Sequence, residues 1–430
     1  MRLLRAGERD FEEFLSKVEN RVHSSGLRLE RGVRSILEDV RRRGDKALLH
    51  YTRIHDGVKL HPFELEVERR EVEEAYEKVP QEFLRTLQKA SRRIRRFHRS
   101  LGKGRDRSFP SEKGIKLGQI VRALEKVGIY VPGGKASYPS TVLMAAIPAR
   151  VAGVREIIMT TPPQEGGISP ASLVAADLAG VDRIYRVGGA QAIGALAYGT
   201  ESIPRVDKIV GPGNRYVAAA KRIVYGVVDI DMVAGPSEIV VVSGGETPPA
   251  FVAADLISQA EHDEMAMAIL ITPSKRFGLE VKEEVKRQLL LLRRKKIAHS
   301  SLKERGAVLV VNNLDEAMKL ANRIAPEHLE LCHPKASLLV KRVKHAGAIF
   351  LGPHTPEAIG DYLAGPNHIL PTGGTARFFS PLGVEDFLKR TNVMRFTKDA
   401  MKRFEKDVKR FTEWEGLEGH YQAVKVRMSR

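Results

Sequence analysis

The chain has 430 residues, more than one hydrophobic core usually holds, so the sequence predicts two or more domains. Hydrophobic residues make up 43% and charged residues 29%, a globular composition that excludes a disordered or fibrous protein. The net charge of +18 raises the alternative of a nucleic-acid-binding protein, but aromatic residues make up only 6% and acids interleave with the basic residues of the tail. We therefore expect a solvated, ion-paired surface and no nucleic-acid partner.

The sequence shows no membrane or secretion signal and therefore predicts a cytoplasmic protein. No run of about 18 apolar residues is found, so neither a transmembrane helix nor a membrane partner is expected. The first residues, MRLLRAGERDFEEF, lack the apolar centre of a signal peptide. A single cysteine, Cys332, excludes an intramolecular disulfide and fits a reducing compartment.

The pattern of apolar residues predicts an α/β fold of two lobes. Residues 1–30 are expected to form a short helical arm, and the stretch to about residue 108 has apolar positions at helical spacing. From Lys116 strands and helices alternate, as in VGIYVPGG, STVLMAAIPARVAG, REIIMTTPP and PASLVAADLAGV, which indicates βαβ units around parallel sheets. A second α/β stretch begins at IVVVSGGETPP, and the tail from Pro381 is mostly one basic helical pattern, a C-terminal helical appendage.

The segment SQAEHDE is a candidate metal site. Gln259 and His262 are three residues apart on a predicted helix, so their side chains share one face. This spacing can offer two ligands to one metal ion. Glutamine is a rare zinc ligand, however, and a polar helix end with a hydrated histidine is the alternative.

The segment APEHLELC places an acid beside an imidazole. Glu327 and His328 follow a proline, which near a helix start can aim the next two side chains into a cleft. Such a pair can act as base and water activator when the two pKa values are pushed apart. The alternative is a glutamate in the first turn of a helix, at its positive end, with a histidine on the surface.

Two further segments carry candidate polar residues. Asp361 and His368 lie in IGDYLAGPNHILPTGGTARFFSPLG, a glycine-rich stretch that is either a substrate-binding loop or a linker. EGLEGH ends in His420, which is either a fourth metal ligand or a surface histidine.

Three glycine turns each follow a predicted strand and precede a helix: VPGG, GGAQAIG and GPGN. Glycine backbones there let phosphates approach helix N-termini. None is a G-x-G-x-x-G, so the standard Rossmann fingerprint is missing. Tight βα turns without a ligand are the alternative.

Taken in order, these segments resemble the histidinol dehydrogenase family along nearly the whole chain. The resemblance rests on GIYVPGG, GGAQAIGALAYGT, VDKIVGPGNRYV, DMVAGPSE, DLISQAEHD, APEHLEL, GDYLAGPNHILPT and EGLEGH. It implies one zinc ion per chain, with the ligands Gln259, His262, Asp361 and His420. It also implies Glu327 and His328 as catalytic residues and Tyr130, Gln191 and Asn214 as NAD contacts. The implied substrate contacts are Ser237, His368 and Glu415, together with His328 and the zinc ligands.

The resemblance further implies two lobes with incomplete Rossmann-like parallel sheets. Residues 31–129 and 237–380 are expected to form the lobe with the zinc and catalytic residues, and residues 130–236 the NAD-contacting lobe. Residues 381–430 would be a tail that reaches the partner of a homodimer with shared active sites, and would bring Glu415 and His420 there.

The implied reaction is the four-electron oxidation of L-histidinol to L-histidine by two NAD, the last step of histidine biosynthesis. A paralogue of the same fold that oxidises another small alcohol, for example a sulfonated diol, is the alternative, and His368 and Glu415 argue against it. A zinc hydrolase without cofactor is disfavoured by the glycine turns. Cys332, the one available thiol, is assigned to packing because a water route needs no thiolate.

Overall fold

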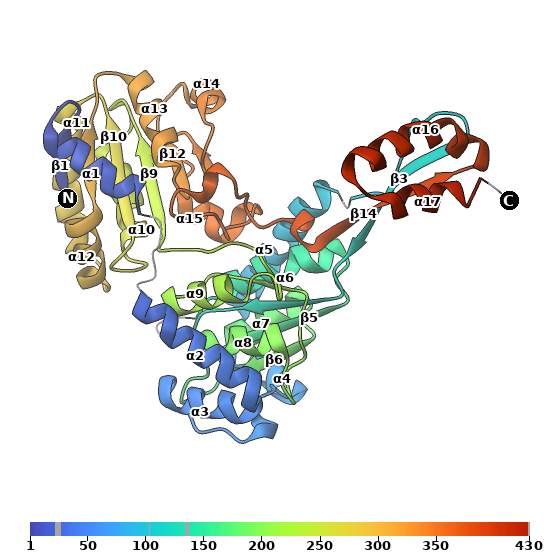
Figure 1. Ribbon diagram of the computed structural model, residues 1–430. Coiled ribbons are helices and arrows are strands. Elements are labelled where there is room, and N and C mark those ends of the chain that lie inside the picture. The colour runs from blue at the N-terminus through green and yellow to red at the C-terminus, as the bar shows by residue number, and fades with distance from the viewer. Residues whose placement is uncertain (22–26, 103, 134–136, 429–430) are drawn as a thin grey trace. The chain divides into compact units, whose positions relative to one another are not determined.

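The computed structural model describes residues 1–21, 27–102, 104–133 and 137–428. The chain divides into a larger unit, Met1–Gly102 with Glu125–Phe387, and a smaller unit, Lys103–Leu124 with Leu388–Arg430. The larger unit contains two parallel sheets with helices around them, and the smaller unit contains one antiparallel sheet (Figure 1). No helix within the described ranges is long and apolar enough to cross a bilayer.

The first sheet of the larger unit has six parallel strands in the order β1-β11-β10-β9-β12-β13. The strands are β1 (Arg2–Arg5), β9 (Glu238–Val242), β10 (Met267–Thr272), β11 (Ala307–Val310), β12 (His328–Leu331) and β13 (Ala348–Leu351). Helices α1 (Arg9–Glu19), α13 (Leu314–Ile324) and α14 (Ala336–Leu339) pack on one face, and α10 (Pro249–Ala260), α11 (Lys275–Leu289) and α12 (Lys295–Arg305) on the other. Because both faces are covered, strands such as EIVVV are apolar throughout.

The second sheet has five parallel strands in the order β6-β5-β4-β7-β8. The strands are β4 (Lys126–Tyr130), β5 (Glu156–Thr161), β6 (Arg183–Arg186), β7 (Lys208–Val210) and β8 (Asp229–Ile230). They are connected by α6 (Pro139–Ala152), α7 (Pro170–Ala179), α8 (Gly189–Tyr198) and α9 (Arg215–Val224). These are the alternating strands and helices that the sequence predicts for this region.

Both sheets follow one strand order. Counted from β4, and from β9 in the six-stranded sheet, the order is 3-2-1-4-5, which is five of the six strands of a Rossmann sheet. The predicted incomplete Rossmann-like lobes are therefore confirmed. In such sheets the strand order reverses beside strand 1, at the topological switch point. Ligands bind there, at the carboxyl ends of the strands. In the five-stranded sheet this point lies between β4 and β7.

The N-terminal third is divided between the lobes differently from the prediction. The helices α2 (Leu27–Arg43), α3 (Asp45–His55) and α4 (Arg69–Lys78) pack around the five-stranded sheet rather than with residues 237–380. The reason is a buried stripe on α2, including Leu37 and Val40, which lies against Gly194 of α8. The predicted arm is also not wholly helical, because it begins with the strand β1, which pairs with β11. Residues 22–26 of that arm lie outside the described residues.

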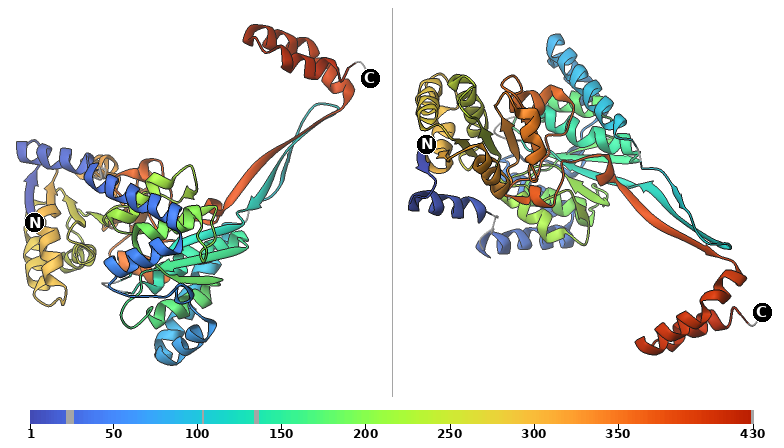
Figure 2. Two further views of the ribbon diagram at one scale, coloured as in Figure 1. Left: turned by 60° about the horizontal axis from the view of Figure 1, so that its bottom comes forward. Right: turned by 90° about the horizontal axis from the view of Figure 1, so that it is seen from above.

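The smaller unit is built on β3 (Ile115–Ala123), which pairs with β2 (Arg107–Phe109) and with β14 (Leu388–Phe396). β3 and β14 run antiparallel along their whole length (Figure 2). Helices α16 (Lys398–Glu415) and α17 (Glu418–Lys425) follow. The prediction of a mainly helical tail is thus wrong for β14, because its partner β3 is remote in sequence and leaves no local pattern.

Candidate active site

Glu327 and His328 lie at the amino end of β12, and both side chains are buried, with 8% and 4% exposed. The predicted helix start is wrong, since the helix α13 ends here and a strand begins. Ala325, at φ 49°, turns the chain out of α13. Pro326 disfavours right-handed helical backbone at Ala325, so α13 does not continue through this residue, and β12 begins at His328.

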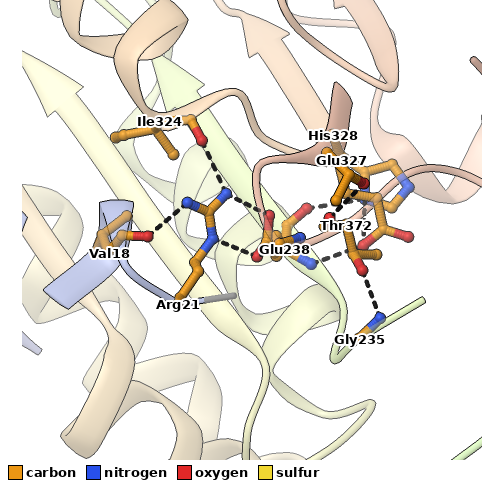
Figure 3. A network of polar contacts seen from close by, with 10 residues as sticks. Val18, Arg21, Gly235, Glu238, Ile324, Glu327, His328 and Thr372 are labelled. Atoms are coloured by element: carbon orange, nitrogen blue, oxygen red, sulfur yellow. Dashed lines mark hydrogen bonds and ion pairs between the residues drawn. The ribbon is translucent and has the colours of Figure 1, made fainter. Parts of the chain in front are cut away.

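One residue binds both members of this pair (Figure 3). The backbone N–H of Glu238 donates to Oε2 of Glu327 at 2.8 Å, and the Glu238 carbonyl oxygen lies 3.0 Å from Nδ1 of His328. A carbonyl oxygen can only accept, so Nδ1 carries the proton and Nε2 carries the lone pair. Nε2 is buried and has no hydrogen-bond partner among the described residues. His328 is thereby prepared to take up a proton at Nε2.

Burial moves the two pKa values in opposite directions. It raises the pKa of Glu327 well above the ordinary value of 4.5, and the nearby carboxyl groups of Glu238, Glu357 and Asp361 raise it further. Burial lowers the pKa of His328 from 6.5. The imidazole is therefore neutral, as a general base must be, and the Glu327 carboxylate, once formed, is a stronger base than an exposed one.

Three of the predicted zinc ligands lie in the larger unit. Gln259 is fully buried in the last turn of α10, and His262 lies in the turn after the helix, with its N–H donating to the Gln259 carbonyl at 3.2 Å. The two residues therefore do not share a helix face as predicted. Asp361 lies in the single turn η3 (Gly360–Ala364). The ligand atoms of His262, Asp361 and Glu357 all lie within 4.8 Å of one another, which suits a divalent cation.

Glu357 is a residue that the sequence analysis missed. It is 2% exposed, at the start of α15 (Glu357–Ile359), and its Oε1 lies 3.7 Å from Nε2 of His328. In the carboxamide orientation that satisfies both groups, the Gln259 nitrogen donates to Oε2 and Oε1 of Glu357 at 2.8 and 2.9 Å. The signal in the sequence was the spacing of Glu357 and Asp361, four residues apart, which is one helical turn.

The remaining predicted substrate contacts are placed as follows. His368 lies with Nδ1 3.8 Å from Oδ1 of Asp361 and Nε2 3.5 Å from the hydroxyl oxygen of Thr141 on α6. Burial lowers the pKa of this imidazole. Ser237 directly precedes Glu238, and its carbonyl oxygen accepts from the Met267 N–H at 2.9 Å. The structure thus brings His368 close to Asp361, a predicted metal ligand, and Ser237 next to Glu238, which contacts Glu327 and His328.

Glu415 and His420 belong to the smaller unit. Glu415 is the last residue of α16, and His420 lies in α17; both are exposed. Gly416, at φ 68°, ends the first helix and separates the two. Their contribution to the site remains a prediction.

The predicted NAD contacts cluster around the topological switch point of the five-stranded sheet. Tyr130 ends β4; its hydroxyl accepts from the Gly189 N–H at 3.2 Å, and burial raises its pKa to about 12. Asn214 follows β7 and caps α9, accepting from two backbone N–H groups at 2.9 and 3.2 Å. Gln191 is 1% exposed, and neither atom of its carboxamide finds a hydrogen-bond partner in the part of the chain that is described. A buried carboxamide left unsatisfied fits a residue whose partner is a ligand.

Cys332 lies one residue beyond β12, with its sulfur 3.8 Å from Oε2 of Glu330. Burial raises the pKa of this thiol, so the thiolate is suppressed. Four residues of extended chain separate it from His328, a span of about 13 Å. We expect Cys332→Ser and Cys332→Ala to keep most of the turnover in a steady-state assay. A loss of about a thousandfold in both variants, with a trapped thiohemiacetal, would contradict the assignment to packing.

Known proteins are similar to this chain along nearly its whole length. The chain matches the family model of histidinol dehydrogenase over residues 19–428. It is 52% identical over 428 residues to histidinol dehydrogenase of Syntrophotalea carbinolica, covering 100% of this chain and 99% of that protein. The identity to histidinol dehydrogenase of Geobacter sulfurreducens is 53% over 431 residues, with 100% of both chains covered. The crystal structure of histidinol dehydrogenase from Elizabethkingia anophelis matches with a TM-score of 0.92 at 36% identity, covering 100% of this chain and 98% of that one.

Two parallel Rossmann-like sheets, a buried acid–imidazole pair and these likenesses define an oxidoreductase. The chain belongs to the histidinol dehydrogenase family. The resemblance drawn from the eight sequence segments is confirmed, and the paralogue acting on another alcohol is disfavoured.

Proposed function

We propose that this protein oxidises L-histidinol through L-histidinal to L-histidine, with two NAD and one water consumed, as the last step of histidine biosynthesis in the cytoplasm. The observation that carries the proposal is the buried pair of Glu327 and His328, held by the two peptide groups of Glu238 beside His262 and Asp361. The family and its named relatives supply the substrate.

His328 acts in both oxidations. Its Nε2 accepts the hydroxyl proton of the alcohol as the hydride leaves the same carbon, which gives the aldehyde. Glu327 takes a proton from the water that adds to the aldehyde, while His328 returns its proton to the carbonyl oxygen, and the hydrate forms. His328 then accepts a hydroxyl proton of the hydrate as the second hydride leaves, which gives the acid. The opposite pKa shifts of the two groups suit this division of work.

The residues present fit zinc and NAD. Gln259, with the clustered ligand atoms of His262 and Asp361, suits zinc, one ion per chain, with His420 of the partner subunit as the fourth ligand. The unsatisfied Gln191 carboxamide, with Tyr130 and Asn214, suits NAD. When bound, zinc would bind and orient the imidazole and amine of the substrate, and NAD would be the hydride acceptor.

We further propose a homodimer in which the smaller unit completes the site of the partner subunit. The supporting observation is the apolar surface of that unit: Phe411 and Trp414 on α16 are 69% and 92% exposed, which a monomer in water does not favour. In such a dimer Glu415 would contact the substrate amine and His420 the zinc ion, both across the subunit boundary.

The test of the proposed function is the stoichiometry of NADH with L-histidinol as limiting substrate. We expect two NADH per histidinol consumed, measured by absorbance, and histidine as the product. Chelation should abolish NADH formation, and zinc should restore it. One NADH with released aldehyde would contradict the role of Glu327, and undiminished turnover in metal-free protein would contradict the zinc site.

A further inference from the structure

We propose that Arg21 and Glu238 are positioning residues, which hold Glu327 and His328 in the geometry of the proposed oxidation. This inference rests on the proposed function only because histidinol oxidation is the reaction used to measure kcat. The structural basis is a continuous network that leads from the end of α1 to the catalytic pair (Figure 3).

Arg21 lies two residues beyond the end of α1, and little of its side chain is exposed. Its Nε donates to Oε1 of Glu238 at 2.5 Å and its Nη2 donates to Oε2 at 2.8 Å, a bidentate pair in which the side chains are 8% and 5% exposed. The guanidinium also donates to the carbonyl oxygens of Val18 at 2.6 Å and Ile324 at 2.8 Å. Four hydrogen bonds therefore fix the plane of this group, and through it the Glu238 carboxylate.

Glu238 needs such an anchor because of its place in the sheet. It is the first residue of β9, and although Met267 of β10 lies opposite it, the pairing with β12 begins only at the next residue, Ile239, opposite His328. On the β12 side its peptide groups are bound by the side chains of Glu327 and His328 instead of by strand backbone. The side-chain anchor therefore limits rotation of the same residue whose N–H and C=O set the two catalytic groups.

A second contact supports the same residue from the glycine-rich segment. The Gly373 N–H donates to Oε1 of Glu238 at 3.1 Å, and the neighbouring Thr372 hydroxyl accepts from the Gly235 N–H at 2.5 Å. Ser237, a predicted substrate contact, lies between these two attachment points. The network thus connects the arm, the glycine-rich segment and the catalytic pair.

A buried ion pair is poorly explained by stability alone. Desolvating both charges costs about as much as their attraction returns, and apolar replacements of similar volume are often neutral or stabilising. A bidentate arginine–carboxylate pair does, however, fix orientation, which a pair of apolar side chains cannot do. The position of this pair, directly behind the catalytic residues, assigns it that role.

The test compares Arg21→Met and Arg21→Lys with a control that removes a different contact of the same arm. Arg323→Met removes the exposed pair between Arg323 and Glu19, 2.9 Å apart, which also ties α1 to α13 but does not contact Glu238. For Arg21→Met we expect kcat to fall about a hundredfold at an unchanged zinc content, with KM for histidinol within about threefold. The reason is that a misplaced general base stabilises the transition state less but leaves substrate binding unchanged. The kcat of Arg21→Lys should be about tenfold higher than that of Arg21→Met, since lysine keeps the positive charge but lacks the two parallel donors of the guanidinium.

Two outcomes would overturn the proposal: folded Arg21→Met with the kcat of the parent protein, or an equal fall of kcat in Arg323→Met, which would indicate docking of the arm as the cause. If Arg21→Met fails to fold, Arg21→Met combined with Glu238→Gln leaves no unpaired buried charge and should fold, again with kcat reduced about tenfold or more. A kcat equal to that of the parent would overturn the proposal there too.

A readout without turnover separates this inference from the proposed function. In ¹⁵N-histidine-labelled protein, the His328 signals, assigned by their loss in His328→Ala, should report the Nδ1–H tautomer in the parent. Arg21→Met should show a mixture of tautomers, and Arg323→Met should not. A protein that fails to oxidise histidinol but shows this change refutes the proposed function alone, and an unchanged tautomer in Arg21→Met refutes the positioning role alone.

Discussion

His328→Ala is expected to lower the rate of NADH formation by about 10²- to 10⁴-fold, because both hydride transfers lose the base that accepts the hydroxyl proton. Glu327→Gln is expected to act differently. It should leave the first oxidation comparatively fast and slow the second, so that the NADH formed per histidinol falls from two toward one. The difference follows from the two roles, since only the second oxidation needs an activated water. Rapid-quench analysis of histidinol, histidinal and histidine measures both steps.

The control for this comparison is His299→Ala, which removes an exposed histidine of α12 and should not change either step. The zinc content of His328→Ala should also match that of the parent, because His328 is not among the proposed ligands. If Glu327→Gln slows the first oxidation as strongly as the second, the assignment of water activation to Glu327 is wrong.

Mixing two inactive proteins should restore activity if the smaller unit crosses to the partner subunit. His328→Ala and His420→Ala are each expected to be inactive as homodimers. In a mixed dimer one site carries both defects, whereas the other has an intact His328 and receives an intact His420. With random exchange, half of the dimers are mixed and each has one working site, so about a quarter of the parent activity should return.

The measurement is NADH formation before and after subunit exchange, with exchange verified by two affinity tags. The mixture before exchange is the control and should stay at background. An absence of recovery after verified exchange would mean that His420 serves the site of its own chain, and the shared-site homodimer would have to be abandoned.

The sequence predicted the parallel lobes and most of the site because those features have local signatures. Alternating strands and helices between Lys116 and Val224 are visible as periodicity, and Glu327 and His328 are adjacent in the chain. The local structure around this pair was predicted wrongly, because a proline suits both a helix start and the extended entry into β12. Only the left-handed turn at Ala325, which no pattern indicates, decides between the two.

The supporting residues could not be predicted from local pattern. Arg21 and Glu238 are 217 residues apart, and each by itself resembles an ordinary charged residue of a basic chain. The same holds for β14, whose register is set by β3, some 270 residues earlier. The placement of α2 to α4 depended likewise on which apolar surface would cover their buried stripe. Such choices are made by tertiary packing, which a single sequence without an alignment does not encode in any one segment.

The position of β1 has a consequence for the synthesis of the chain. Within the described residues β1 pairs with β11 alone, and β11 follows it by roughly 300 residues. At about 5 to 20 residues per second, a nascent β1 therefore waits about 15 to 60 s for its partner. During that time its backbone N–H and C=O groups are open to pairing with other nascent chains. The strand is only four residues long, RLLR, with an exposed arginine at each end. Short length and flanking charge are the means by which natural edge strands avoid such pairing, so β1 is suited to a long wait on the ribosome.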